Sequence, residues 1–285
     1  MEGKAKFSEI EPPISTAAPT PPPWIDLPDA LTANILQRLS AEDILERVQE
    51  VCTTWWRVSK NLPTWRVLEL DIHRYGGSHF KRFYTRAVDR SQGELTDLKV
   101  YCYRKKDLLD YVVKRSSKLL RLTLVDCNYK ATDLAKAIKK LPQLEELHLI
   151  MWSAVSPEEV ANIGISCPTL KSFQYIKYWD EARLHAENQY WNEDRSEFED
   201  ADEEYGVAIG KSMPNLRHLQ PWGLKMTNEG LEAILNGCPH LESLNLRQCR
   251  GLVLQWDLVK RCKRIKDLKL PIYCTSDFSR QVQTT

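Results

Sequence analysis

Short apolar motifs recur along most of the chain at a nearly constant spacing. The pattern apolar-x-x-apolar-x-apolar occurs seven times, with first positions 24, 25, 26, 46, 25 and 24 residues apart. The copies are Leu95/Leu98/Val100, Leu119/Leu122/Leu124, Leu144/Leu147/Leu149, Leu170/Phe173/Tyr175, Leu216/Leu219/Pro221, Leu241/Leu244/Leu246 and Ile265/Leu268/Leu270. This alternation predicts a short β-strand in each copy. Trp65/Leu68/Leu70 lies 30 residues before Leu95 and is a candidate for an irregular first copy.

The second half of each repeat predicts a helix. Ser156-Pro157-Glu158-Glu159 places an N-cap serine before a proline and two glutamates, the pattern that starts a helix. Comparable apolar stripes are Leu108/Leu109/Val112, Leu134/Ala137/Ile138/Leu141, Leu231/Ile234/Leu235 and Leu258/Val259/Cys262. A strand and a helix repeated about every 25 residues cannot bury both faces alone. We therefore predict an α/β solenoid of about seven repeats, with a parallel sheet on the concave face and helices on the convex face.

The region before the repeats predicts three short helices. Leu31, Ile35, Leu36 and Leu39 follow helical spacing, and Ser40 opens a second helix that carries Ile44, Leu45, Val48 and Val51 inward. A third helix contains Trp55, Trp56 and Val58. A core of about forty residues is marginal by itself, so this much Leu, Ile and Trp indicates a partner surface.

Composition marks the segments that fall outside these units. Six of the fifteen prolines lie before Trp24, so we expect residues 1–22 to be a disordered arm. Between Asp180 and Glu204, eleven acidic residues stand against two arginines, and this net charge of −9 coincides with the single long step between repeats. We predict an acidic insertion at 180–206, which engages a basic substrate, shields the +10 charge of the rest of the chain, or is a tolerated surface loop. Residues 275–285 are expected to form a flexible tail.

Other features exclude whole classes of function. No stretch approaches the ~18 apolar residues of a membrane span, and no apolar segment follows the first residues, so neither membrane insertion nor secretion is expected. The net charge of +1 does not indicate nucleic-acid binding. Five of the eight cysteines recur at equivalent repeat positions and are predicted to be buried. The sequence contains no C-x-x-C pair, the spacing that would suggest a zinc site. No catalytic motif, metal site or cofactor site is found.

Two sets of residues carry a family resemblance. Cys127 and Cys249 stand eight positions after Leu119 and Leu241, as in the leucine-rich-repeat pattern. The segment before the repeats contains, in order, Trp24, Leu27-Pro28, Ile35-Leu36, Leu39, Leu45, Val51-Cys52, Trp55 and Pro63-Thr64-Trp65. This order resembles the F-box motif, from which Trp56 departs. The chain from 23 to 274 thus resembles a plant F-box/leucine-rich-repeat protein, with an F-box at 23–66 and repeats at 67–274.

The resemblance implies a substrate receptor of a cullin-RING ubiquitin ligase of the SCF type. The F-box would bind the Skp adaptor and, through it, the cullin and RING subunits, in the nucleus, the cytoplasm or both. The expected adaptor contacts are Leu27, Pro28, Ile35, Leu36, Leu39, Leu45, Val51 and Trp55, with Leu27, Pro28, Ile35, Leu36 and Leu39 forming an exposed apolar strip. Such a chain is not an enzyme, since it supplies neither an active cysteine nor a RING.

The repeats are expected to bind a protein substrate through the polar positions of their strands. Alternate strand residues face away from the core, so these positions line up on the concave face. The candidate substrate contacts are Tyr101, Arg121, His148, Gln174, Trp222 and Arg247, of which Trp, Tyr and Arg are the residue types enriched at interface hot spots.

Three alternatives remain open at this stage. The chain could be a leucine-rich-repeat scaffold or inhibitor without a ubiquitin role, its N-terminal helices capping the solenoid. An RNA-binding role is disfavoured, because basic and aromatic residues are not interleaved along one strand face. Lys260-Arg261-Cys262-Lys263-Arg264 resembles a nuclear import signal, but cations at the end of a helix explain it as well.

Overall fold

The computed structural model describes residues 23–72, 77–101, 106–127, 129–151, 155–177, 205–224, 226–247, 249, 251–253 and 256–271. The arm predicted at 1–22 and the tail predicted at 275–285 lie outside these residues. The acidic insertion predicted at 180–206 also lies outside them, except that a helix already begins at Tyr205.

Eight parallel strands form one sheet in the order of the sequence, as expected for a solenoid. They are β1 (Val67–Asp71), β2 (Asp97–Tyr101), β3 (Arg121–Val125), β4 (Glu146–Met151), β5 (Ser172–Lys177), β6 (His218–Trp222), β7 (Ser243–Asn245) and β8 (Asp267–Lys269). β1 pairs in register with β2, so the irregular copy at Trp65/Leu68/Leu70 is a true first repeat. The α/β solenoid predicted from the sequence is confirmed.

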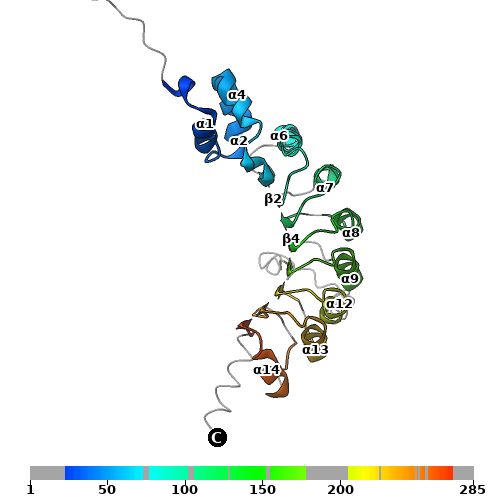
Figure 1. The fold of residues 1–285 in the computed structure, drawn as a ribbon. Helices are drawn as coiled ribbons and strands as arrows, with labels where there is room; N and C mark the ends of the chain where they lie inside the picture. Colours follow the sequence, from blue (N-terminus) through cyan, green and yellow to red (C-terminus); the bar gives the residue numbers. More distant parts are fainter. Residues whose placement is uncertain are drawn as a thin grey trace, which may run out of the picture.

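The helices lie on the convex side of the arc (Figure 1). They are α6 (Gly77–Arg90), α7 (Lys106–Val113), α8 (Ala131–Ile138), α9 (Pro157–Ser166), α12 (Tyr205–Ser212), α13 (Asn228–Gly237) and α14 (Trp256–Cys262). α9 begins as predicted, with a reciprocal capping box between Ser156 and Glu159. The sequence reading missed α6 and α12.

The core runs along the solenoid between sheet and helices. Leu98, Leu122 and Leu147 occupy equivalent register positions and are at most 1% exposed. The five cysteines predicted to be structural are also buried, and they are Cys127, Cys167, Cys238, Cys249 and Cys262. Their thiols contact the neighbouring repeat, since Cys238 Sγ lies 3.4 Å from the carbonyl oxygen of Met213. Burial raises the pKa of Cys167 and Cys249 to about 12, which makes them poor nucleophiles.

Short helices precede β1, and together with the intervening turns they form the N-terminal helical unit (23–66). They are η1 (Pro23–Asp26), α1 (Asp29–Leu36), α2 (Ala41–Asp43), η2 (Ile44–Val48, with π-helical hydrogen bonds), α3 (Gln49–Val51), α4 (Thr53–Ser59) and η3 (Pro63–Arg66). The Ser40 side chain caps α2 as predicted, by accepting from the Asp43 N–H at 3.1 Å. Ile44, Leu45 and Val48 point inward, but Val51 is 58% exposed, so its predicted burial is wrong.

The N-terminal helical unit packs directly against the first repeats. Trp65, which lies near the end of the unit and is also the first apolar position of the first repeat, is 2% exposed, and its indole donates to the carbonyl oxygen of Ser59 at 2.7 Å. On the other side, Arg86 and Arg90 of α6 both donate to the side-chain oxygen of Gln49, at 3.4 and 3.2 Å. These contacts place the helical unit over the β1 end of the solenoid (Figure 1).

Helices α12 and α13 pack unusually closely because glycines face each other. A Cβ added to Gly237 would lie 1.8 Å from the carbonyl oxygen of Gly210, and one added to Gly206 would lie 2.5 Å from the Cα of Gly230. Only residues without a side chain permit such an approach between helix backbones.

Candidate functional site

Exposed apolar side chains concentrate in the N-terminal helical unit. Among the described residues, seven of the twelve large hydrophobic side chains with high exposure lie between Trp24 and Trp56. Helix α1 shows the cause, because it is apolar on two faces. Leu36 is fully buried in the core, while Leu31 and Ile35 remain 52% and 46% exposed. A helix that is apolar all round needs cover on both sides, so one face of α1 lacks a partner within the chain.

The residues predicted to contact the adaptor divide into three groups. Pro28, Ile35, Leu39 and Val51 are exposed, and Leu27 and Trp55 are half-buried. The prediction of an exposed strip is wrong for Leu36, which packs into the core. Leu45, at 3% exposure, is also a core residue rather than part of a surface.

Four exposed apolar residues of this unit were not among the predicted contacts, and one of them is Trp56 of α4, which is 44% exposed. Trp24 and Ile25 lie in η1 and are 57% and 50% exposed, and Leu31 lies on the open face of α1. Leu31 and Ile35 are four residues apart and so lie on the same face of the helix. This spacing could have predicted that Leu31 is exposed beside Ile35.

The concave face of the sheet carries two polar rows, formed by the first and third residues of each strand. In the first row, Arg121 Nε lies 2.7 Å from a carboxylate oxygen of Asp97 on the neighbouring strand. This hydrogen bond raises the pKa of Arg121. His148 of the third-residue row contacts the Ser172 hydroxyl at 3.1 Å, and burial lowers its pKa. These contacts join side chains of neighbouring strands, so part of the hydrogen-bonding capacity of the polar rows is used within the chain.

The fifth strand residues form an apolar row beside the polar ones. The row contains Tyr101, Val125, Ile150, Ile176 and Trp222, which are neighbours in register from β2 to β6. Tyr101, Ile150 and Ile176 are half-buried, Trp222 is 37% exposed, and Val125 is buried at 8% exposure. Five apolar side chains spaced by the ~4.8 Å between strands form a continuous stripe of about 19 Å. We call this stripe the concave apolar row.

The predicted substrate contacts are therefore spread over three rows. Tyr101 and Trp222 are the ends of the concave apolar row, whereas Arg121, His148 and Gln174 belong to the polar rows. Arg247 lies beyond the end of β7 in a turn, exposed, so its predicted place on the strand face is wrong. Val125, Ile150 and Ile176 occupy the same register position as Tyr101 and Trp222 but were missed, because the prediction selected polar and aromatic residues on this face.

Comparison with known proteins identifies the chain. No family model matches it. F-box/LRR-repeat protein 22 of Arabidopsis thaliana is 35% identical, over 94% of this chain and 83% of that protein. The F-box protein SKIP19 of the same plant is 37% identical, over 90% and 79% of the two chains. This chain belongs to the plant F-box/leucine-rich-repeat family.

Two further comparisons add less. F-box/LRR-repeat protein 23 of Arabidopsis thaliana is 43% identical over 87% of this F-box/leucine-rich-repeat protein, which spans only 53% of that relative. Among solved structures, a Bacteroides fragilis protein covers 77% of each chain at 14% identity and a TM-score of 0.32, too distant to inform fold or function.

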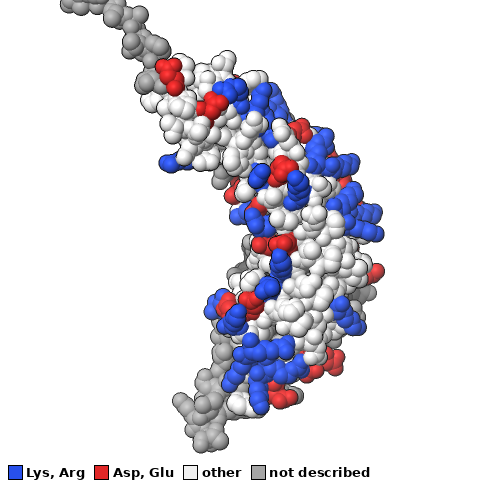
Figure 2. Space-filling model, in the orientation of Figure 1, with Lys and Arg blue, Asp and Glu red and all other residues white. Residues whose placement is uncertain are grey.

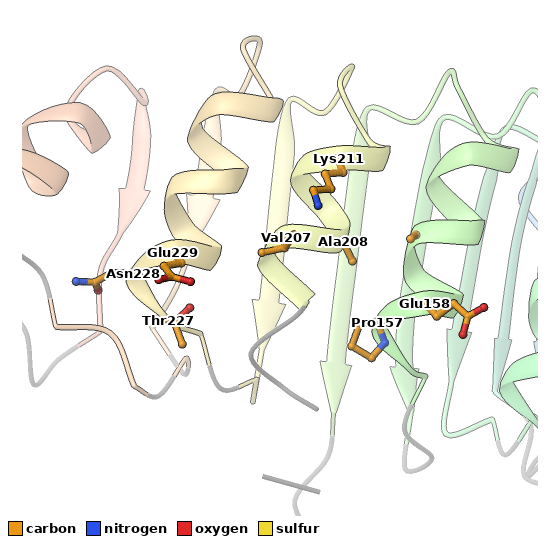
Figure 3. Close-up of a pocket in the computed structure, with 9 residues that line it drawn as sticks. Pro157, Glu158, Val207, Ala208, Lys211, Thr227, Asn228 and Glu229 are labelled. Carbon is orange, nitrogen blue, oxygen red and sulfur yellow. The ribbon is translucent and has the colours of Figure 1, made fainter. Parts of the chain in front are cut away.

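A hollow lies on the convex face of this F-box/leucine-rich-repeat protein. It measures about 840 Å³ and lies over α12, between α9 and the start of α13 (Figure 3). Its lining combines small residues such as Ala161 and Ala208 with Glu158, Glu229 and Lys211.

Within the described part of the chain, no group of His, Cys, Asp and Glu could hold a metal ion. No helix in that part is long and apolar enough to cross a membrane.

The basic sequence at 260–264 is part of the folded solenoid. Cys262 in its centre is fully buried, and Arg261 donates to the Asn236 side chain at 2.6 Å. Arg264 donates to the carbonyl oxygen of Leu235, near the end of α13. These contacts favour the interpretation as cations at helix ends, since an import receptor reads an accessible segment.

Proposed function

We propose that this F-box/leucine-rich-repeat protein is a non-catalytic substrate receptor of an SCF-type ubiquitin ligase. The N-terminal helical unit binds the Skp adaptor, and through it the cullin and RING subunits, while the repeats bind a protein substrate. The chain contributes positioning, which raises the effective concentration of substrate near the ubiquitin-conjugating enzyme. This role places the chain in the nucleus, the cytoplasm or both.

The observation that carries the proposal is the open face of α1. Leu31 and Ile35 are apolar and exposed on a helix whose opposite face is already buried, and Leu39 is exposed in the turn that follows it. Burial of one such side chain contributes about 1.5–3 kcal/mol when it is complete, so several of them supply a stable interface.

The same face argues against the scaffold alternative. The helical unit does cover the β1 end of the solenoid, as a capping unit does (Figure 1). Caps of repeat proteins, however, require a polar outer face to keep the protein in solution. An outer face with Trp24, Leu31 and Ile35 exposed fits a second protein better than water.

The substrate surface follows from the concave apolar row. Tyr101 and Trp222 at its ends, and the aliphatic residues between them, offer a partner apolar contacts beside the polar rows. Large aromatic anchors surrounded by polar groups are the usual composition of an interface centre.

The proposal is tested by comparing proteins captured from plant cells with three forms of the chain. The first form is wild type, the second carries Leu31→Ala and Ile35→Ala, and the third carries Tyr101→Ala and Trp222→Ala. We expect the second to lose the adaptor and retain the substrate, and the third to do the opposite. Retention of the adaptor by the second form, after both variants are shown to be folded, contradicts the proposal.

A further inference from the structure

The two edges of the parallel sheet differ in charge. Each helix runs back across its strand, so the loops that lead from a helix into the next strand share one edge, called here the basic edge. These loops are residues 90–96, 114–120, 139–145, 166–171, 211–217, 236–242 and 261–266. They contain thirteen Lys and Arg against three Glu, a net charge of +10.

At the opposite edge, where helices begin, five of the seven described helices of the repeats carry an acidic residue in the first turn. Acidic residues of the first helical turns include Asp107, Asp133, Glu158, Glu229 and Asp257. In Figure 2 the blue of Lys and Arg gathers around α7 and α8 and again over α14. The repeat array is therefore polarised across the width of its sheet.

Local structure explains only part of the basic edge. Cations are favourable at helix C-termini, but this effect falls off within the last turn. The three glutamates of the edge are already paired, in Lys118–Glu94, Lys171–Glu145 and Arg217–Glu242. Lys114, Lys139 and Lys140 are exposed and pair with no described residue. Their mutual repulsion is a cost that contacts among the described residues do not offset.

A hollow on the basic edge presents several donors together. It measures about 320 Å³ and lies where the repeats of β5, β6 and β7 begin. Lys171, Arg217 and His240 line it, with the polar side chains of Thr169 and Asn215 and the carboxylate of Glu145, which pairs with Lys171. A carboxylate that enters this hollow meets two cations and an imidazole, in competition with the glutamates that already pair with those cations.

The spacing of the cations suits an extended acidic polypeptide. Neighbouring strands lie ~4.8 Å apart, and an extended chain advances ~3.3 Å per residue. A segment along the edge therefore meets a new repeat about every one and a half residues, and spans the ~24 Å from β3 to β8 in about seven residues. The seven loops contain no Trp, Tyr or Phe on which bases could stack, which disfavours single-stranded nucleic acid.

We propose that the basic edge is an interaction surface for an acidic segment of a partner protein. The surface is separate from the open face of α1 and from the concave apolar row, so it does not depend on the proposed ligase role. Binding there is electrostatic, and it weakens steeply as salt increases.

The test uses the full chain and a labelled peptide of about twelve consecutive glutamates, followed by fluorescence anisotropy at physiological salt. An edge variant carries Lys114→Gln, Lys139→Gln and Lys140→Gln. A matched control carries Lys81→Gln, Arg82→Gln and Lys130→Gln, which removes the same charge from exposed positions away from the edge. A single-stranded oligonucleotide of equal charge is titrated in parallel.

We expect the edge variant to bind the peptide about tenfold more weakly than wild type, and the control to stay within about twofold. Equal losses in the two variants, or no binding by wild type, overturn the proposal. Tighter binding of the oligonucleotide than of the peptide overturns it as well, and assigns the edge to nucleic acid instead. Because neither variant alters α1, adaptor binding remains an independent measurement.

Discussion

Replacement of Gly237 by alanine tests whether glycine contact sets the spacing of α12 and α13. In the structure, the added Cβ would lie 1.8 Å from the carbonyl oxygen of Gly210 and 2.5 Å from its carbonyl carbon. Real Cβ atoms essentially never approach other atoms within 3.0 Å, so one helix must move by more than 1 Å. The atoms in the way belong to the backbone, and no rotamer change can relieve the clash.

The cost follows from overpacking of a close-packed interior. Inserted methyl groups typically cost 1–3 kcal/mol, and a clash between two backbones belongs at the upper end, at about 3 kcal/mol. Without the clash, alanine in a helix is favoured over glycine by up to about 1 kcal/mol. A backbone clash therefore predicts that Gly237→Ala lowers the free energy of unfolding. Without a clash, the same substitution should raise it.

Urea unfolding of the full chain, followed by circular dichroism, measures this change. Gly93→Ala is the control, because its Cβ would meet its nearest atom at 3.5 Å and only its φ of +81° opposes the substitution. We expect the control to lose about 1 kcal/mol. A Gly237→Ala protein as stable as wild type, or more stable, refutes the close packing of α12 on α13.

Three further predictions concern individual groups. Ser156→Ala removes the capping box of α9 and should lower the free energy of unfolding by about 1 kcal/mol, measured in urea. Cys167, Cys238 and Cys249 should react with iodoacetamide at pH 8 only after unfolding, because burial raises the pKa of these thiols to about 12, 11 and 12; equal labelling rates in native and unfolded chain would contradict this. The hydrogen bond from Arg57 lowers the pKa of Asp29 below 3.8. The Arg57–Asp29 pair therefore stabilises the folded chain fully above pH 3.8, and this contribution disappears as the pH falls through the lowered pKa. Asp29→Asn should therefore lower the melting temperature at pH 7 but not near pH 2, and a deficit that persists in acid would assign the effect to another cause.

The sequence predicts the solenoid well because one physical constraint is repeated many times. Each strand must bury two apolar side chains, as Leu98 and Val100 do in β2, and the helix behind it must cover them. Helix α6 was missed although Phe80, Tyr84 and Ala87 are buried at helical spacing. Helix α12 carried less signal, since two of its buried positions are Gly206 and Gly210, which stand beside the buried Tyr205 and Ile209.

The binding surfaces were predicted less completely, for reasons that lie in tertiary packing. Leu31 and Leu36 are both leucines of α1, and only the packed structure shows which of them faces the core. The concave apolar row depends on strand register, which places Ile150 beside Val125 and Ile176. Tyr101 and Trp222 of the same row were predicted as aromatic anchors, whereas the aliphatic residues between them were not selected as contacts.

The most direct measurement of the central claim is the affinity of the purified chain for a purified Skp adaptor, by isothermal titration calorimetry. The variant carries Leu31→Ala and Ile35→Ala, and the control carries Ile165→Ala and Val253→Ala, two side chains that are 71% and 72% exposed elsewhere. Each truncation removes three methylene equivalents, about half exposed, so the variant should lose about 2.4 kcal/mol, or about fiftyfold in Kd. We expect tight one-to-one binding by wild type and control, and binding weaker by about fiftyfold in the variant alone. No binding by wild type, or equal binding by all three proteins, contradicts it.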